Sequence, residues 1–526
     1  MAGGAGPVKA RPVTVGGQMR RGWGSTALAA TIMLVTLAPV VAVLLRSGEA
    51  GLQSGDLGAV RFTLLQAMLS ALLSTVLAVP VARALARRRF AGRGVLIALF
   101  GAPFLLPVVV AVLGLLALFG RSGLVNAGLT TLGLPEVRIY GLHGVVLAHV
   151  FLNLPLAVRM LLHGWEAIPG DRLRLAAALD FDARAMWRHI EVPMLRAVLP
   201  GAALVIFVLC LTSFAVALTL GGGPAATTVE LAIYQAVRFD FALPRAAVLS
   251  LVQLALCGLA LMLAAGVTQP GMFGAGSGRR SGFAPGGWRR AGDAAVLTFA
   301  AVFLIVPLGL VMLRGLPGLA DLPAGTGAAA MRSLVIAAGS GLLATGCALV
   351  LALAAARGQR GATLAATLPL ATSSLVLGTG LFLIVNPFMA PSRLALPVTL
   401  GVNAALALPF VFRLLLPEAR TLREDYGRLS DALGLEGLAR LRWVTLPRLA
   451  RPLGYGAGLA MALSMGDLGV IALFAGEAEA TLPLMVQRLM AAYRMEAAAA
   501  VALLLVALGL VLFWLCDHAG RRVAAA

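Results

Sequence analysis

The chain contains 526 residues, of which 60% are hydrophobic and 12% are charged, and its formal net charge is +20. This composition excludes an ordinary soluble globular domain, which does not need so much apolar surface, and indicates a polytopic membrane protein. The positive charge would also fit nucleic acid as a partner, so the placement of the arginines must separate the two interpretations.

Twelve segments are apolar enough to cross a bilayer, which takes about 20 residues for each helical span. Because a backbone in hydrocarbon must satisfy its own hydrogen bonds, we expect all twelve to be helices. The predicted fold class is therefore an all-α polytopic membrane protein. In chain order the predicted spans are 26–45, 60–82, 95–119, 141–163, 197–218, 246–267, 294–313, 333–355, 362–387, 394–416, 452–475 and 497–516.

The basic residues gather on one side of this predicted topology. The N-terminal tail is basic, and the other clusters fall after every second span, at 83–93, 159–196, 279–290, 357–360, 413–451 and 521–522. This positive-inside bias predicts a bacterial inner-membrane protein with both termini in the cytoplasm and lipid, not nucleic acid, as its surroundings. No evident cleavage site follows the basic tail, so we expect the first span to be retained.

The two halves of the chain repeat each other. Residues 254 positions apart match repeatedly, as in Pro155 with Pro409, Arg159 with Arg413, Asp171 with Asp425, and Arg188 with Arg442. Six predicted spans separate the copies, and an even number returns the chain to the same side of the membrane. The halves are therefore predicted to be parallel and pseudosymmetric, with six helices each.

These features predict five regions. Residues 1–59 hold the basic tail, the first span and an outer loop, and 60–267 form a first transmembrane domain. Residues 268–330 comprise a cytoplasmic linker, the seventh span and an outer loop, and the linker itself (268–293) is rich in Gly, Pro, Ser and Arg. That composition predicts flexibility. A second transmembrane domain follows at 331–517, and 518–526 form a cytoplasmic tail.

A polar, helix-patterned insert lies between the fourth and fifth spans of each half, at 176–193 and 430–447, and the two align without a gap. Pro193 and Pro447 are placed to stop one helix and begin the next at a fixed angle. A short helix across the cytoplasmic face could transmit force from a soluble partner to the bundle. The alternative is an amphipathic connector on the lipid headgroups, but duplication at equivalent positions favours the first interpretation.

Both inserts resemble the cytoplasmic EAA loop of permeases from binding-protein-dependent ABC importers. That loop reads Glu-Ala-Ala, three residues, Gly, and then Pro thirteen residues after the Gly. Gly434, Pro447 and Pro193 match. The Glu position instead holds Arg174 and Arg428, and Asp180 stands where Gly is usual, which puts the first insert's tight turn in doubt because Gly favours positive φ.

The resemblance implies the MetI-like fold, a cytoplasmic ABC ATPase dimer docked on both inserts, and a periplasmic substrate-binding protein outside. The coupling residues that it implies are Arg174, Ala177, Leu179, Asp180, Arg188, Pro193, Arg428, Leu433, Gly434, Arg442 and Pro447. Residues 212–241 and 464–498 further resemble segments of thiamine importer permeases. Ferric-iron importer permeases share this fused layout, so thiamine, its phosphates and ferric iron stay open as substrates.

No catalytic machinery is evident in the sequence. A P-loop needs a lysine after its glycines, and the single lysine, Lys9, has no following Ser or Thr. The histidines and cysteines lack metal-ligand spacing. We therefore expect no cofactor, no metal and no enzymatic activity, with ATP hydrolysed by a partner.

Four residues are candidates for the substrate pathway. Asp467 lies within a predicted span, where an acid suggests function by default, and could attract a cation; it could equally be bonded to a neighbouring helix or cap a helix break. Its counterpart is Ser213. Glu230 and Tyr234 share a helical face beyond the fifth span and could line the pathway mouth, or be solvated without a role. A twelve-span secondary transporter is the main rival, but it would need more such acids for ion coupling and no duplicated insert.

Overall fold

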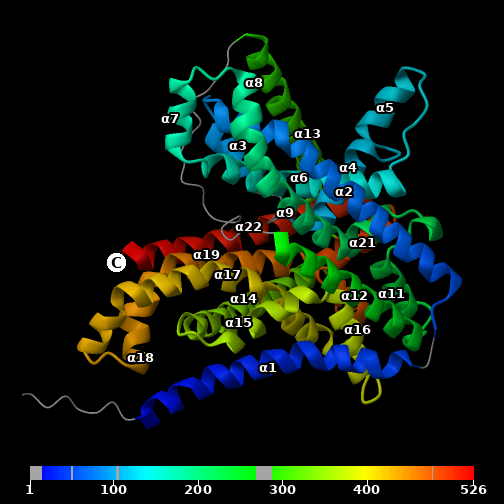
Figure 1. The fold of residues 1–526 in the computed structure, drawn as a ribbon. Coiled ribbons are helices and arrows are strands. Elements are labelled where there is room, and N and C mark those ends of the chain that lie inside the picture. Colours follow the sequence, from blue (N-terminus) through cyan, green and yellow to red (C-terminus); the bar gives the residue numbers. More distant parts are fainter. Residues whose placement is uncertain (1–14, 49–50, 102–105, 268–286, 477, 526) are drawn as a thin grey trace, which may run out of the picture.

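The computed structural model of the protein describes residues 15–48, 51–101, 106–267, 287–476 and 478–525, and the regular structure in these ranges is entirely helical. Eleven helices are long and apolar enough to cross a membrane, and a bent helix pair at Arg360–Ala371 and Ser374–Val385 makes a twelfth span if counted as one. The prediction of an all-α polytopic membrane protein is confirmed. Figure 1 shows the arrangement.

The helices of the first half are α1 (Val15–Ser47), α2 (Ser54–Arg87), α3 (Arg93–Leu99), α4 (Val108–Phe119), α5 (Leu124–Thr131), α6 (Leu142–Glu166), α7 (Gly170–Ala178), α8 (Ala183–Met186), the π turn η2 (Trp187–Glu191), α9 (Val192–Leu211), α10 (Phe214–Leu220), the 3-10 turn η3 (Pro224–Ala226), α11 (Val229–Arg238) and α12 (Leu243–Val267).

Those of the second half are α13 (Trp288–Gly318), α14 (Thr326–Ala356), α15 (Arg360–Thr367), the 3-10 turn η4 (Leu368–Ala371), α16 (Ser374–Val385), the 3-10 turn η5 (Pro391–Leu394), α17 (Ala395–Ala432), α18 (Gly437–Arg440), the π turn η6 (Leu441–Thr445), α19 (Leu446–Met465), α20 (Gly469–Phe474), α21 (Leu482–Ala491) and α22 (Met495–Ala525).

Four predicted spans are not single helices. The segment 95–119 is divided into α3 and α4, and 362–387 bends by 94° between η4 and α16. Proline accounts for both, because Pro107 stands at the start of α4 and Pro369 lies in η4 just before the bend, and neither can donate a backbone hydrogen bond. The segments 197–218 and 452–475 break at 212–213 and 466–468.

The linker prediction is wrong in part. Residues 268–286 lie outside the described part of the chain, but 288–293 form the first turns of α13 rather than a flexible segment. Asp293 accepts hydrogen bonds from the guanidinium groups of Arg87 and Arg88 at the end of α2. These ion pairs join the start of the second half to the first half.

The repeat is visible in equivalent contacts. The Thr63 hydroxyl on α2 accepts the Val229 N–H at the start of α11, and the Ser333 hydroxyl on α14 accepts the Leu482 N–H at the start of α21, both at 2.9 Å. Thr63 and Ser333 are 270 residues apart. α2 packs on α6 and α9, and α14 packs on the corresponding helices α17 and α19. The two halves therefore share one internal architecture.

The first helix of each half packs on the other half. α1 lies along α15 and α16 of the second half and α12 of its own half, whereas α13 packs against α2 and α4 of the first half and α22 of its own half. Glycine permits both crossings: a Cβ at Gly114 of α4 would meet the Pro307 carbonyl of α13, and one at Gly380 of α16 would overlap the Pro39 carbonyl of α1. This exchange holds the halves together as one bundle.

Both inserts lie at the same end of the bundle. In Figure 1, α7 of the first insert lies at the upper left, α18 of the second insert and the start of α1 lie at the lower left, and the C-terminus lies at the left, whereas α5 and α11 lie at the right. The halves are therefore parallel, as the even number of intervening spans predicts.

Candidate functional site

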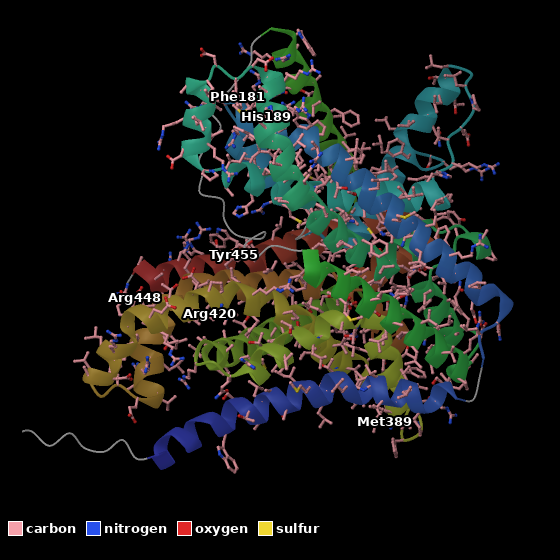
Figure 2. The ribbon with its side chains drawn as sticks, in the orientation of Figure 1. Phe181, His189, Met389, Arg420, Arg448 and Tyr455 are labelled. Atoms are coloured by element: carbon pink, nitrogen blue, oxygen red, sulfur yellow. The ribbon has the colours of Figure 1, made fainter. Side chains whose placement is uncertain are left out.

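The first insert forms a tight turn in spite of its Asp. Asp180 adopts φ of 49°, and the Phe181 N–H donates to the Ala176 carbonyl at 3.0 Å, which closes the end of α7. The Asp182 carboxylate then accepts the Ala185 N–H at 2.7 Å and begins α8. Phe181 and His189 face each other across the turn, with ring centroids 5.9 Å apart (Figure 2).

The second insert has the same turn. Gly434 adopts φ of 63°, and the Leu435 N–H donates to the Ser430 carbonyl at 2.9 Å. Asp is among the few residues with a side chain that visit this left-handed conformation, at roughly 1–2 kcal/mol. The doubt about Asp180 is thereby resolved, because the turn forms with Asp as it does with Gly.

The two prolines do not stop a helix, contrary to the sequence prediction. η2 and η6 are π turns. The Val192 N–H donates to the Trp187 carbonyl in η2, and the Leu446 N–H donates to the Leu441 carbonyl in η6. Each leads without a break into the next span, and Pro193 and Pro447 sit in the first turn of α9 and α19. The wider turn accommodates a proline ring that would crowd the preceding turn of an α-helix.

The first insert is tied to the bundle by charged groups. Arg83 of α2 makes a 2.6 Å salt bridge with Glu191, and its guanidinium lies 4.5 Å from the ring centroid of Trp187. Both partners belong to η2. Glu191 is buried, and the Arg83 guanidinium provides a counter-charge to its carboxylate.

The second insert lacks an equivalent of this clamp, by which we mean the contacts of Arg83 with Glu191 and Trp187. The positions equivalent to Arg83, Trp187 and Glu191 hold Leu353, Leu441 and Thr445. Its own contacts are more local: Arg448 of α19 lies 4.5 Å from the ring centroid of Tyr426 of α17, and Arg440 bonds Asp431 at 3.1 Å.

The predicted coupling residues gather at the two inserts, and nearly all of them are exposed. In the first insert Arg174 bonds the exposed carboxylate of Asp171, and Ala177, Leu179, Asp180, Arg188 and Pro193 are exposed; in the second, Arg428, Leu433, Gly434 and Arg442 are exposed and Pro447 is half-buried. Leu438 is 82% and Trp443 68% exposed. Large apolar side chains at a polar apex are typical of a protein-binding surface.

Ser213 and Asp467 occupy equivalent helix breaks. Ser213 precedes α10 in the break after α9, and Asp467 lies between α19 and α20. A break within a membrane leaves backbone carbonyls without partners. In the first half, the Gln66 amide donates to the Cys210 carbonyl at 3.0 Å and the Gln253 amide to the Leu211 carbonyl at 2.9 Å.

The second break is braced differently. The Asn403 amide donates to the Ser464 hydroxyl at 2.9 Å, while Asp467 Oδ2 is buried without a hydrogen-bond partner among the described residues. Gly466 is packed against Pro107, and Gly469 against the Ser374 hydroxyl at the start of α16. Sequence reasoning missed Gln66, Gln253 and Asn403, although amides within apolar spans are a usable signal.

Glu230 is completely buried near the start of α11, where its carboxyl lies beside the Ser373 hydroxyl and the Gln253 amide without full hydrogen-bond geometry. Burial raises the pKa of Glu230 to about 8, so the carboxyl is neutral at pH 7 in this conformation. Tyr234, half-buried one turn later, packs between Phe214 and Phe239, with centroids at 5.1 and 5.6 Å. In this conformation Glu230 is closed off from solvent, whereas Tyr234 keeps part of its surface exposed.

These features define a class: a polytopic helical permease with two parallel halves, each carrying an insert at one common face. No protein-family model matches the chain. It is 41% identical to the thiamine transport system permease protein ThiP of Brucella suis over 474 residues, which cover 87% of each chain.

Other relatives agree. The chain is 38% identical to the protein of the same name from Escherichia coli over 494 residues, covering 88% of this chain and 89% of the relative. It is also 32% identical over 182 residues to the molybdenum transport system permease protein ModB of Azotobacter vinelandii, which covers 35% of this chain and 80% of that protein. The chain belongs to the ThiP family of transport system permease proteins.

Proposed function

We propose that this protein forms the translocation pathway of an ATP-driven importer for thiamine or its phosphates. The names of the relatives support the substrate. One structural observation carries the mechanism: two inserts with the same turn project from one face of a pseudosymmetric bundle. A cytoplasmic ATPase dimer would bind both, and a periplasmic binding protein would deliver the substrate to the opposite face.

Coupling follows from the way each insert is attached. The second half of each insert continues through a π turn into a span, so a displacement of the apex moves α9 or α19 directly. Closure of the ATPase dimer would draw the apices together and shift the bundle between inward- and outward-facing states. The ATPase does so by binding one state better than the other.

We further propose that residues 60–267 and 331–517 are two permease units and that both termini are cytoplasmic. The ModB match supports the first point, because a shorter permease aligns over 182 residues, less than half of this chain. The basic clusters on the side of the inserts support the second.

Asp467, Ser213, Glu230 and Tyr234 are proposed to meet the substrate as the halves move. Thiamine carries a cationic ring, and buried acids with aromatic neighbours provide both charge and π-face contacts for a cation. The four residues lie at two helix breaks and on α11, which are the places where irregular backbone can face a pathway.

The test is uptake by proteoliposomes that contain the permease, its ATPase and its binding protein. We expect uptake of labelled thiamine that depends on internal ATP and on the binding protein. Uptake of ferric iron but not thiamine would refute the substrate, and ATP-independent uptake driven by an ion gradient would refute the mechanism.

A further inference from the structure

A surface cavity of about 690 Å³, open to solvent, lies beside the second insert, between the end of α14 and the polar part of α17. Its lining residues are Ala356, Arg420, Arg423, Glu424, Asp425 and Arg428. Figure 2 labels Arg420 at this end of the bundle. Five of its six lining residues carry charged, exposed side chains, and one of them, Arg428, is also a predicted coupling residue.

Most of these charges have no partner within the described part of the chain. Arg423 donates to the Ala356 carbonyl at the end of α14, which fixes its guanidinium at the wall. Arg420, Glu424 and Arg428 share one face of α17 at i, i+4 and i+8, a spacing that commonly forms ion pairs. Here no ion pair or side-chain hydrogen bond is recorded for these three or for Asp425 within the described residues.

The mixture of charges indicates the chemistry of a ligand. Guanidinium groups bind phosphate through paired N–H donors, and three of them line the cavity. The two carboxylates would repel a simple polyanion but would attract an ammonium or another cationic group. We propose that this cavity binds a phosphate ester that also carries a cationic group.

Two sources supply that chemistry. One is the headgroup of phosphatidylethanolamine, because the cavity lies just past the apolar part of α17, where headgroups are found. The other is a phosphorylated form of thiamine, made by phosphoryl transfer to the imported substrate, and this source rests on the proposed function. A site for such a product at the inner face would let it regulate import.

The ATPase is a less suitable occupant. An ATPase dimer presents similar surfaces to both inserts, but the first half has Glu166 and Pro169 where the second has Arg420 and Arg423. Glu166 also approaches Arg93, at 3.8 Å. Arg420 and Arg423 are therefore unsuited to a contact that both inserts share, whereas Arg428 has a counterpart in Arg174 of the first insert.

The first experiment measures binding of thiamine monophosphate to the purified full-length permease by calorimetry. Thiamine lacks the phosphate and inorganic phosphate lacks the cation, so both should bind at least about tenfold more weakly. The double variant Arg420→Gln/Arg428→Gln should weaken thiamine monophosphate binding about tenfold or more. The matched control Arg121→Gln/Arg138→Gln removes two exposed arginines elsewhere and should not change it.

A second variant tests the cationic group. Glu424→Gln/Asp425→Asn should weaken the binding of thiamine monophosphate, because the attraction of its cationic group is lost. The same variant should strengthen the binding of inorganic phosphate, because the repulsion of the anion is removed. Tighter binding of both ligands by this variant would overturn the proposal that the carboxylates bind a cationic group.

The lipid source is tested in parallel by native mass spectrometry of permease from nanodiscs that contain phosphatidylethanolamine or phosphatidylglycerol. Preferential retention of phosphatidylethanolamine by the wild type and its loss in Arg420→Gln/Arg428→Gln would assign the site to lipid. Equal binding of all probes by wild type and variant would overturn the proposal, as would a variant that changes only ATPase affinity. The lipid result does not depend on thiamine uptake, so failure of the proposed function would be distinguishable.

Discussion

The two inserts end in the same turn but are attached to the bundle in different ways. In the first, Pro169 separates α6 from α7, and Arg83 clamps the following π turn through Glu191 and Trp187. In the second, α17 runs for 38 residues from the membrane into the insert, and no such clamp is present among the described residues. The first insert is therefore held to the bundle by an ion pair, and the second by a continuous helix.

The comparison shows that a turn and its support are separate physical problems. The turn depends on a few backbone hydrogen bonds and one residue of positive φ, so a repeat can preserve it with Gly or Asp. Rigidity requires either unbroken helical hydrogen bonding or side chains from another element. In the first insert the break at Pro169 interrupts the helical hydrogen bonding, and the side chain of Arg83 from α2 provides the support instead.

The largest effect is expected from Gly434→Val. A β-branched residue is poorly suited to φ of 63° and should cost at least about 1–2 kcal/mol in the turn, which misplaces the second apex and abolishes most ATP-driven uptake in proteoliposomes. Gly133→Val is the matched control, because Gly133 has φ of 69° and open space around it, outside both inserts. Equal loss of uptake in both variants would mean that the second turn has no special role.

The ion-pair clamp can be tested by giving the first insert the residues of the second. Arg83→Leu alone leaves the buried Glu191 carboxylate without its partner and should lower the free energy of unfolding by about 2 kcal/mol, less than for a fully buried pair because Arg83 is partly exposed. Adding Glu191→Thr removes that charge and should restore part of the loss. Thermal unfolding in detergent would measure both, and strictly additive losses would contradict the clamp.

Glu230→Gln should change the pH dependence of stability. Because the pKa of Glu230 is raised from 4.5 to about 8 in the folded state, its contribution is fully present below about pH 4.5 and is lost as pH rises through about 8. The Gln variant should lack this decline in stability. Unfolding midpoints measured from about pH 5 to 9, which spans most of the interval between the two pKa values, would show the difference. A wild-type curve that matches the variant across this range would show that Glu230 ionises without cost.

The smallest effect is expected from exchanging the two turn residues. Asp180→Gly should raise the free energy of unfolding by about 0.5–1 kcal/mol, since Gly adopts positive φ without a steric cost. Gly434→Asp should lower it by a similar amount and retain uptake. Loss of uptake in Gly434→Asp would mean that the two turns are not interchangeable.

The corrections to the predicted topology share one cause. Apolar runs such as 197–218 and 452–475 identify membrane segments by composition, but composition does not show whether the helix continues. The breaks at Ser213 and Asp467 depend on amides from other helices, Gln66 and Asn403 among them, which supply the lost hydrogen bonds. Likewise, the doubt about Asp180 could be settled only by its backbone conformation.

The sequence alone determined the features that depend on composition, periodicity and local turns: a membrane protein of about twelve spans, two parallel halves, and an insert in each. These follow from the length of an apolar helix and from residues close together in the chain. Only the tertiary structure decided that α1 and α13 also pack on the opposite half, that Arg83 supports one insert, and that charged residues line an open cavity beside the other. Those features join residues far apart in the chain, where packing and buried charge, rather than local pattern, select the partner.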